Sequence, residues 1–81
     1  MKIRLKVFAS IRDICGFDET ELSLPETTTL NGLLDIIAVQ YSGLAAKRAS
    51  LLMAVNEEYS TGGTILHDND TVALFPPVSG G

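Results

Sequence analysis

Cysteine and histidine are almost absent from this sequence of 81 residues. Cys15 is the only cysteine, so the chain cannot form an internal disulfide, and a disulfide-stabilised scaffold is excluded. Cys15 and His67 are its only thiol and imidazole, whereas a structural zinc ion requires four ligands. We therefore expect no metal site and, because no disulfide is used, a reducing, cytoplasmic location.

Long apolar runs and clusters of positive charge are missing as well. No apolar run approaches the roughly 20 residues of a membrane span, and no uninterrupted apolar segment follows the basic N-terminal residues as in a signal peptide. Lysine and arginine number six, four of them within the first twelve residues, against ten acidic residues. Because a nucleic-acid-binding surface needs clustered cations, we expect neither nucleic acid nor a membrane as a partner.

The sequence does contain enough apolar residues for one small folded domain. Hydrophobic residues make up 46% of the chain and charged residues 20%, which indicates a globular protein rather than a disordered one. A chain of this length buries about 60% of its surface. That is enough for one modest core and too little for a core plus a large internal active site.

The first part of the chain predicts two paired strands. Apolar residues alternate with basic ones over residues 2–8, and a second alternation runs over residues 19–24, so both segments are typical of half-buried strands. Glu19 and Glu21 would lie opposite the basic face of the first strand, which favours antiparallel pairing. Between these strands, residues 9–15 fit a short helical turn.

The remainder predicts one main helix and two further strands. Apolar residues recur at helical spacing over residues 30–41, after three threonines at 27–29 that are candidate N-caps. Residues 51–55 predict a buried strand, and the polar residues 56–63 predict a turn-rich loop. Residues 71–75 predict the last strand, and their apolar run predicts burial on both faces, as in a central or parallel strand.

The order strand, strand, helix, strand, strand indicates a β-grasp, an α+β fold in which one main helix covers one face of a mixed sheet. We expect a β-grasp domain over residues 1–75 and a flexible Gly-Gly tail over residues 76–81. The length of the chain predicts one domain, and the sequence contains neither an internal repeat nor a linker.

Side chains suited to catalysis are few. His67 stands between Leu66 and Asp68 in a predicted turn, and we interpret it as a solvated turn histidine rather than a general base. Cys15 has no evident activating neighbour, which favours a mostly buried core thiol over a reactive thiol or persulfide carrier. The basic face of residues 2–8 is interpreted as a solvated strand face, with partner docking as the alternative.

The last segment of the chain has unusual composition for a frayed terminus. No charged side chain follows Asp70, and Pro76-Pro77 resists both helix and central-sheet pairing. Gly80 and Gly81 have no Cβ, so they would pass through a channel that any other residue would block. Residues that we expect to thread such a channel are Pro76, Pro77, Val78, Ser79 and Gly80. The working group would be the α-carboxylate of Gly81, which is ionised at neutral pH.

The terminal Phe75-Pro-Pro-Val-Ser-Gly-Gly resembles the end of the molybdopterin synthase small-subunit family, which consists of ubiquitin-like β-grasp sulfur carriers. Four other segments resemble the same family, namely residues 7–13, 29–37, 54–56 and 68–73. The resemblance covers nearly the whole chain. Asn69 stands where the family usually has glycine, and asparagine also tolerates the left-handed conformation of such a turn.

The resemblance implies a non-catalytic subunit that donates sulfur. An ATP-dependent adenylyltransferase of the ubiquitin-activating type would convert the Gly81 carboxylate into an acyl-adenylate, and a sulfur donor would then leave a thiocarboxylate. The carrier would dock on the synthase large subunit, in a heterotetramer, and supply sulfur to cyclic pyranopterin monophosphate. That step forms the dithiolene of molybdopterin during molybdenum cofactor biosynthesis. The carrier itself would bind no cofactor tightly, since ATP is used by the activating enzyme.

Phe8, Phe75 and Arg12 are the residues that we expect to dock on the large subunit. Phe8 and Phe75 are large apolar groups beside the motif positions, and the competing interpretation places both in the core. Three other functions stay open. The first is a sulfur carrier of another pathway, such as thiamine synthesis. The second is a protein modifier that is joined to lysines through Gly81, and the third is an interaction module with an inert tail.

Overall fold

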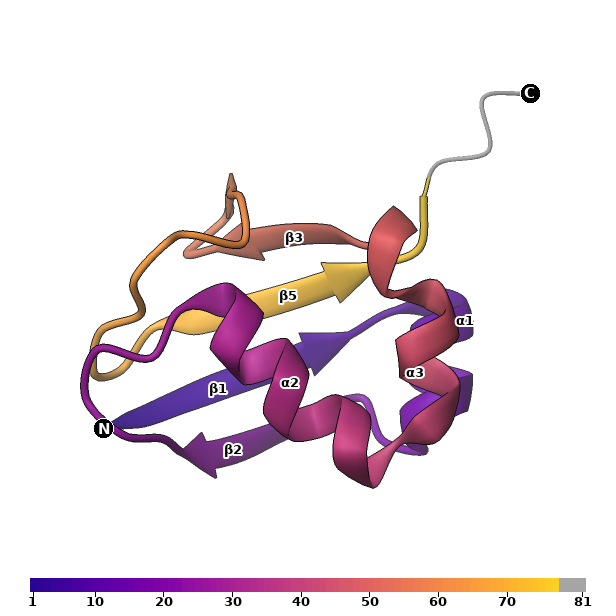
Figure 1. The fold of residues 1–81 in the computed structure, drawn as a ribbon, viewed down its shortest axis with the longest axis horizontal. Helices are drawn as coiled ribbons and strands as arrows, with labels where there is room; N and C mark the ends of the chain where they lie inside the picture. The colour runs from indigo at the N-terminus through magenta and orange to yellow at the C-terminus, as the bar shows by residue number, and fades with distance from the viewer. Residues whose placement is uncertain (78–81) are drawn as a thin grey trace.

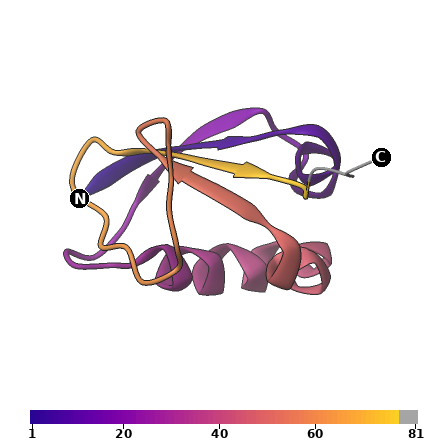
Figure 2. The same cartoon turned by 90° about the horizontal axis from the view of Figure 1, so that it is seen from above.

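The structure, a computed structural model, describes residues 1–77 and arranges them in two layers. Its strands are β1 (Lys2–Val7), β2 (Glu19–Ser23), β3 (Leu52–Val55), β4 (Glu58–Tyr59) and β5 (Thr71–Phe75). Its helices are α1 (Ala9–Cys15), α2 (Leu30–Gln40) and α3 (Ser42–Lys47), with a 3₁₀ turn at Arg48–Ser50. The strands form a mixed sheet in the order β2-β1-β5-β3-β4, and α2 and α3 lie against one of its faces (Figure 1, Figure 2). This confirms the predicted β-grasp.

Strands β1 and β2 pair antiparallel, as their charges predict. Arg4 faces Glu21 in the register, and Lys6 faces Glu19. Arg4 approaches Glu19 at 3.2 Å and Glu21 at 3.8 Å, Lys2 lies 3.7 Å from Glu21, and Lys6 lies 3.8 Å from Glu19. Solvent-exposed pairs of this kind contribute little stability each. Their consequence is electrostatic, because every cation of β1 has a carboxylate beside it and the strand presents no free basic strip.

Helix α2 is the main helix that the apolar spacing predicts. Its N-cap is Thr29, whose hydroxyl accepts a hydrogen bond from the backbone N–H of Gly32 at 3.1 Å. The helix ends at Gln40, and α3 begins at Ser42, with only Tyr41 between the two helices. Within the described residues, no helix is long and apolar enough to cross a membrane. The core lies between the sheet and these helices and includes Ile3, Leu5, Val7, Leu30, Leu33, Leu34, Ile37, Val72 and Leu74.

Strand β5 corrects one prediction. It is central, parallel to β1 and antiparallel to β3, as its apolar run indicates. Val72 and Leu74 are buried beneath the helices, but Ala73 and Phe75 are only half-buried on the opposite face. Burial on both faces is therefore wrong for the described residues, because α2 and α3 cover only one side of the sheet (Figure 2). The sheet keeps one open face.

The loop after β3 contains a strand that the sequence did not predict. Ala54 pairs with Tyr59 and Val55 pairs with Glu58, so β4 extends the sheet by two residues. The hairpin turn consists of Asn56 and Glu57, whose φ angles of 51° and 71° are both left-handed. A strand of two residues is too short to show an alternating pattern in the sequence. The usual sequence signal for a two-residue turn of this kind is asparagine followed by glycine. In this chain Glu57 follows Asn56 where glycine would be usual, so the sequence lacks the signal that predicts such a hairpin.

Candidate functional site

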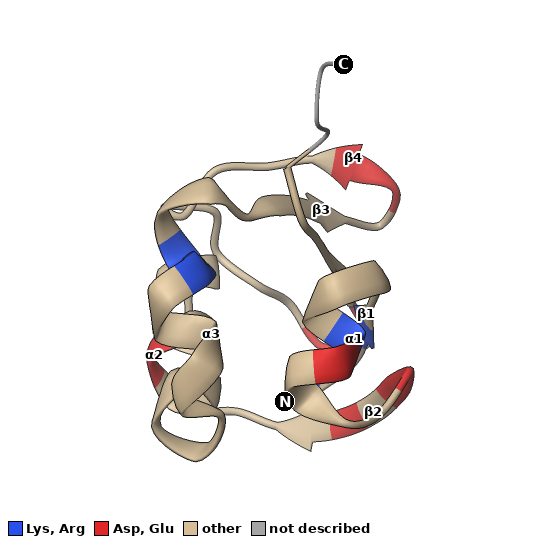
Figure 3. Cartoon of the chain, turned by 90° about the vertical axis from the view of Figure 1, so that its right-hand side faces the viewer, with Lys and Arg blue, Asp and Glu red and all other residues tan. Residues whose placement is uncertain are grey.

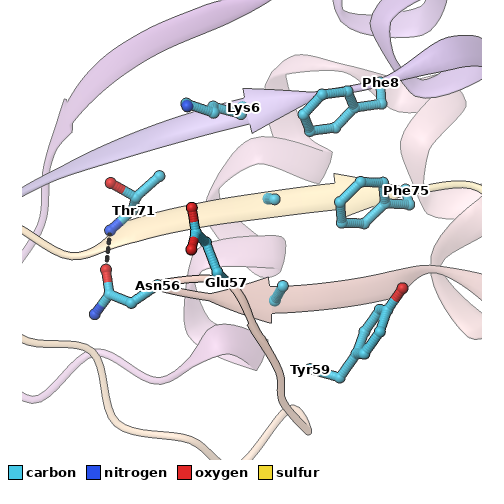
Figure 4. Close-up of a pocket in the computed structure, with 9 residues that line it drawn as sticks. Lys6, Phe8, Asn56, Glu57, Tyr59, Thr71 and Phe75 are labelled. Atoms are coloured by element: carbon cyan, nitrogen blue, oxygen red, sulfur yellow. Dashed lines mark hydrogen bonds between the residues drawn. The ribbon is translucent and has the colours of Figure 1, made fainter.

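Two aromatic rings far apart in the sequence stack on the open face of the sheet. Phe8 directly follows β1 and Phe75 ends β5, and the two strands are parallel neighbours in which Val7 faces Leu74. The rings lie 4.7 Å apart between centroids and are nearly parallel, at 8° (Figure 4). The backbone N–H of Phe8 donates to the carbonyl of Leu74 at 3.2 Å, which holds the pair in place. The stack therefore lies where Pro76 leaves the sheet.

The aromatic pair forms one side of a hollow on this face. Ala54 and Ala73 face each other in the β3–β5 register, and their small side chains leave room between the surrounding larger ones. The other residues around the hollow are Lys6, Phe8, Asn56, Glu57, Tyr59, Thr71 and Phe75 (Figure 4). Tyr59 is 76% exposed and Phe8 is 40% exposed. Large aromatic groups exposed together are typical of a surface that a partner covers.

The predicted docking residues do not all meet in the structure. Phe8 and Phe75 lie together outside the buried core, so the interpretation that placed both in the core does not hold. Arg12 lies apart on α1, where its guanidinium is 3.4 Å from the carboxylate of Asp18, and it borders a separate depression. Docking by these residues stays a prediction.

Tyr59 also borders the hollow, and it was not predicted from the sequence. The available signal was an aromatic residue in a polar, turn-rich loop.

The segment after β5 is only partly described. Pro76 is half-buried and Pro77 exposed, and neither belongs to a helix or strand. Val78, Ser79, Gly80 and Gly81 lie outside the described residues. The predicted domain boundary after Phe75 and the predicted threading of the tail therefore stay predictions.

Cys15 is a core residue in the structure. Its side chain is 7% exposed at the end of α1, and it packs in the buried cluster with Ile11. Desolvation by burial raises the pKa of the Cys15 thiol, so less of the nucleophilic thiolate exists at neutral pH than for an exposed cysteine. This agrees with the interpretation of Cys15 as a buried thiol without chemistry.

The turn before β5 uses its polar groups to hold the backbone. Asp70 is nearly buried, and its carboxylate accepts hydrogen bonds from the backbone N–H of His67 at 2.8 Å and from Asn56 Nδ2 at 2.9 Å. The side chain of His67 is 79% exposed, which fits a solvated turn histidine. Asn69 has a φ of 71°, the left-handed conformation that its residue type predicts. Across residues 1–77, no cluster of three or more histidine, cysteine or acidic residues could hold a metal ion.

Comparison with known sequences identifies the family to which this chain is similar. The chain matches the ThiS family model over residues 5–81. The molybdopterin synthase sulfur carrier subunit of Escherichia coli K12 is 37% identical over 81 residues, covering 98% of this chain and 99% of its own length. The protein of the same name from Arabidopsis thaliana is 32% identical over 81 residues, covering 100% of this chain and 84% of its own length.

Solved structures agree with the fold. A Pyrococcus furiosus protein, a candidate subunit 1 of the molybdopterin converting factor, has a TM-score of 0.87 at 31% identity, over 96% of this chain and 99% of its own. SAMP1 of Haloferax volcanii, a small archaeal modifier protein, has a TM-score of 0.87 at 24% identity over 100% of both chains. A chain in the Helicobacter pylori complex of molybdopterin-converting factor subunits 1 and 2 has a TM-score of 0.70 at 23% identity, again over 100% of both. The last two likenesses concern the fold alone.

Proposed function

We propose that this chain, which belongs to the ThiS family of sulfur carriers, serves as the sulfur-donating small subunit of molybdopterin synthase. The supporting observation is the stacked Phe8–Phe75 pair on an open sheet face, at the point where the Pro-Pro-Val-Ser-Gly-Gly segment, which has no charged side chain, begins. Full-length similarity to two sulfur carrier subunits of that synthase supports the same conclusion. Molybdenum cofactor biosynthesis is then the pathway.

The proposed chemistry takes place at the carboxylate of Gly81. A carboxylate is a poor electrophile, so an adenylyltransferase first uses ATP to form an acyl-adenylate at this carbon and releases pyrophosphate. A donor that supplies sulfur at the oxidation level of sulfide then attacks the acyl carbon, the bond from this carbon to the phosphate oxygen of AMP breaks, and a thiocarboxylate remains. The thiocarboxylate is a good nucleophile for cyclic pyranopterin monophosphate. Glycine suits both steps because no side chain hinders its acyl carbon.

The rest of the domain acts as the docking module in this proposal. The open sheet face with Phe8, Tyr59 and Phe75 would lie against the synthase large subunit, while residues 76–80 lead Gly81 into its active site. A Helicobacter pylori protein of the same fold occurs in a complex of molybdopterin-converting factor subunits 1 and 2. We propose the same pairing here, within a heterotetramer. Arg12 is kept as a peripheral docking residue, since it lies apart from the hollow.

A protein-modifier function is the second candidate. The observation in its favour is the Gly-Gly end of the sequence. In that case, Gly81 would be joined to lysines of other proteins, and an isopeptide remnant on those lysines would reveal it. A carrier for thiamine or another sulfurated product is the third candidate. Co-purification with a molybdopterin synthase large subunit would separate it from the proposed function.

The decisive test is the intact mass of the protein after incubation with the activating enzyme, ATP and a sulfur donor. We expect a mass increase equal to the replacement of one oxygen by sulfur, located at Gly81 by fragmentation. Omission of ATP is the control and should leave the mass unchanged. A protein that stays unmodified under conditions that charge the Escherichia coli carrier would contradict the proposal.

Cys15 should be dispensable for this activity. We expect Cys15→Ala to retain thiocarboxylate formation and molybdopterin synthesis, because the thiol is buried and its pKa is raised. The variant would lose some stability through the small cavity it creates. Activity should be measured well below its melting temperature, which is determined by circular dichroism. A folded Cys15→Ala protein that forms the thiocarboxylate but cannot pass on its sulfur would show this prediction to be wrong.

A further inference from the structure

Glu57 occupies a backbone position that disfavours its own residue type. Its φ of 71° is left-handed, and so is the φ of 51° at Asn56 before it. Asparagine tolerates this conformation, but glutamate is strained there and glycine would not be. Strained residues that a fold retains are found preferentially at functional sites. The strain at Glu57 therefore makes its side chain a candidate functional group.

The carboxylate of Glu57 reaches the hollow with no cation beside it. Glu57 borders the hollow together with Lys6, and Figure 4 shows its side chain extending over β5. Among residues 1–77, no lysine, arginine or histidine nitrogen lies within 4.0 Å of Glu57, and Lys6 has Glu19 as its partner at 3.8 Å. Figure 3 shows acidic residues and no basic ones on the β3–β4 hairpin. Of the two charged residues that border the hollow, Lys6 is thus paired with Glu19, whereas the carboxylate of Glu57 has no ion-pair partner among the described residues.

Three aromatic residues, Phe8, Tyr59 and Phe75, also border the hollow. The stacked Phe8–Phe75 rings lie along it, and Tyr59 lies beyond β3 with most of its surface exposed (Figure 4). A carboxylate and aromatic faces around one small depression match the guanidinium group. Arginine forms paired hydrogen bonds to a carboxylate and stacks on aromatic rings, whereas the ammonium of lysine is a compact, strongly hydrated charge.

We infer that the hollow receives an arginine side chain of the synthase large subunit, with Glu57 as the residue that recognises its charge. This inference rests on the proposed function, because it names the chemistry of the partner that docks there. The net charge of −4 on this chain favours approach of a partner with a basic docking surface. Glu57 then sets partner choice, and the aromatic residues supply most of the buried apolar contact.

The neighbouring Glu58 provides a matched control. It carries the same charge one residue further along, but it borders a different hollow with Ser60, Ile65 and His67. Replacing either glutamate by glutamine removes one exposed negative charge and keeps the shape of the side chain. A difference between the two variants therefore reports the position of the charge and not the net charge of the protein.

The test is the affinity of the large subunit for the wild-type chain, Glu57→Gln and Glu58→Gln, measured by calorimetry at low and high salt. We expect Glu57→Gln to weaken binding about tenfold at low salt and less at high salt. Glu58→Gln should change the affinity by less than about twofold. Equal effects of the two variants, or no effect of Glu57→Gln, would overturn the inference.

A third variant separates recognition from a structural role. Glu57→Gly removes the backbone strain, so we expect its melting temperature to rise by roughly 4 °C while its binding weakens as in Glu57→Gln. A lower melting temperature, or unchanged binding, would overturn the inference. Phe75→Ala distinguishes this failure from that of the proposed function. If binding needs Phe75 but not Glu57, only the inference is wrong, whereas a wild-type chain that does not bind the large subunit contradicts both.

Discussion

A peptide tag added after Gly81 is expected to abolish thiocarboxylate formation and molybdopterin synthesis completely. The tag converts the terminal carboxylate into an internal amide, so the acyl carbon of Gly81 no longer carries a carboxylate oxygen that could attack the α-phosphate of ATP. Folding should be unaffected, because the last strand ends at Phe75 and the buried core ends at Leu74. Loss of activity without loss of stability is the signature of a working group in the tail.

The measurement combines intact mass after activation with a molybdopterin assay in the reconstituted synthase. A chain with the same tag at its N-terminus is the control, and it should be charged normally. Removing the C-terminal tag with a protease that leaves Gly81 last should restore the modification. Full activity from a protein whose C-terminal tag is demonstrably intact would eliminate the carrier mechanism.

Truncation of the aromatic pair is expected to have the second largest effect. Phe75→Ala should weaken binding to the large subunit by about 2 kcal/mol, roughly thirtyfold, because aromatic anchors at an interface centre carry much of the binding energy. The same variant should lower the melting temperature only modestly. Phe75 is half-buried and its ring stacks on Phe8 rather than on the core between sheet and helices.

Val39→Ala is a suitable control for this experiment. Val39 is an apolar residue of α2 that is 87% exposed, and α2 lies on the opposite side of the sheet from the hollow. We expect the control to bind like the wild-type chain. Affinities are measured by calorimetry and stabilities by thermal unfolding. A Phe75→Ala protein that melts far lower yet binds normally would show that Phe75 serves the fold and not the docking.

The secondary structure was largely readable from local patterns. The alternation in β1 and β2, the apolar spacing of α2 and the apolar run of β5 are each confined to a few neighbouring residues. The charges of Glu19 and Glu21 also predicted antiparallel pairing of β2 with the basic face of β1, and the structure supplies the register. Sequence similarity then supplied the family, since the resemblance and the match over residues 5–81 both extend along the chain.

The hollow could not be predicted from local sequence patterns. Phe8 and Phe75 become neighbours only because β1 and β5 pair in parallel with Val7 opposite Leu74, and periodicity contains no information about which strands pair. Tyr59 joins them through a strand of two residues, which is too short to leave a pattern.

What the sequence determined by itself is four of the strands, the main helix, the α+β class and the final segment without charged side chains, because each depends on contiguous residues. The tertiary structure decided which face of the sheet stays open and which side chains meet there. Glu57 shows the difference most clearly. In the sequence it is one of ten acidic residues, whereas the hairpin turns it over the central strand, at the border of a hollow that the two stacked rings also border. That placement depends on long-range strand pairing, whose specificity comes from the packing of the whole core.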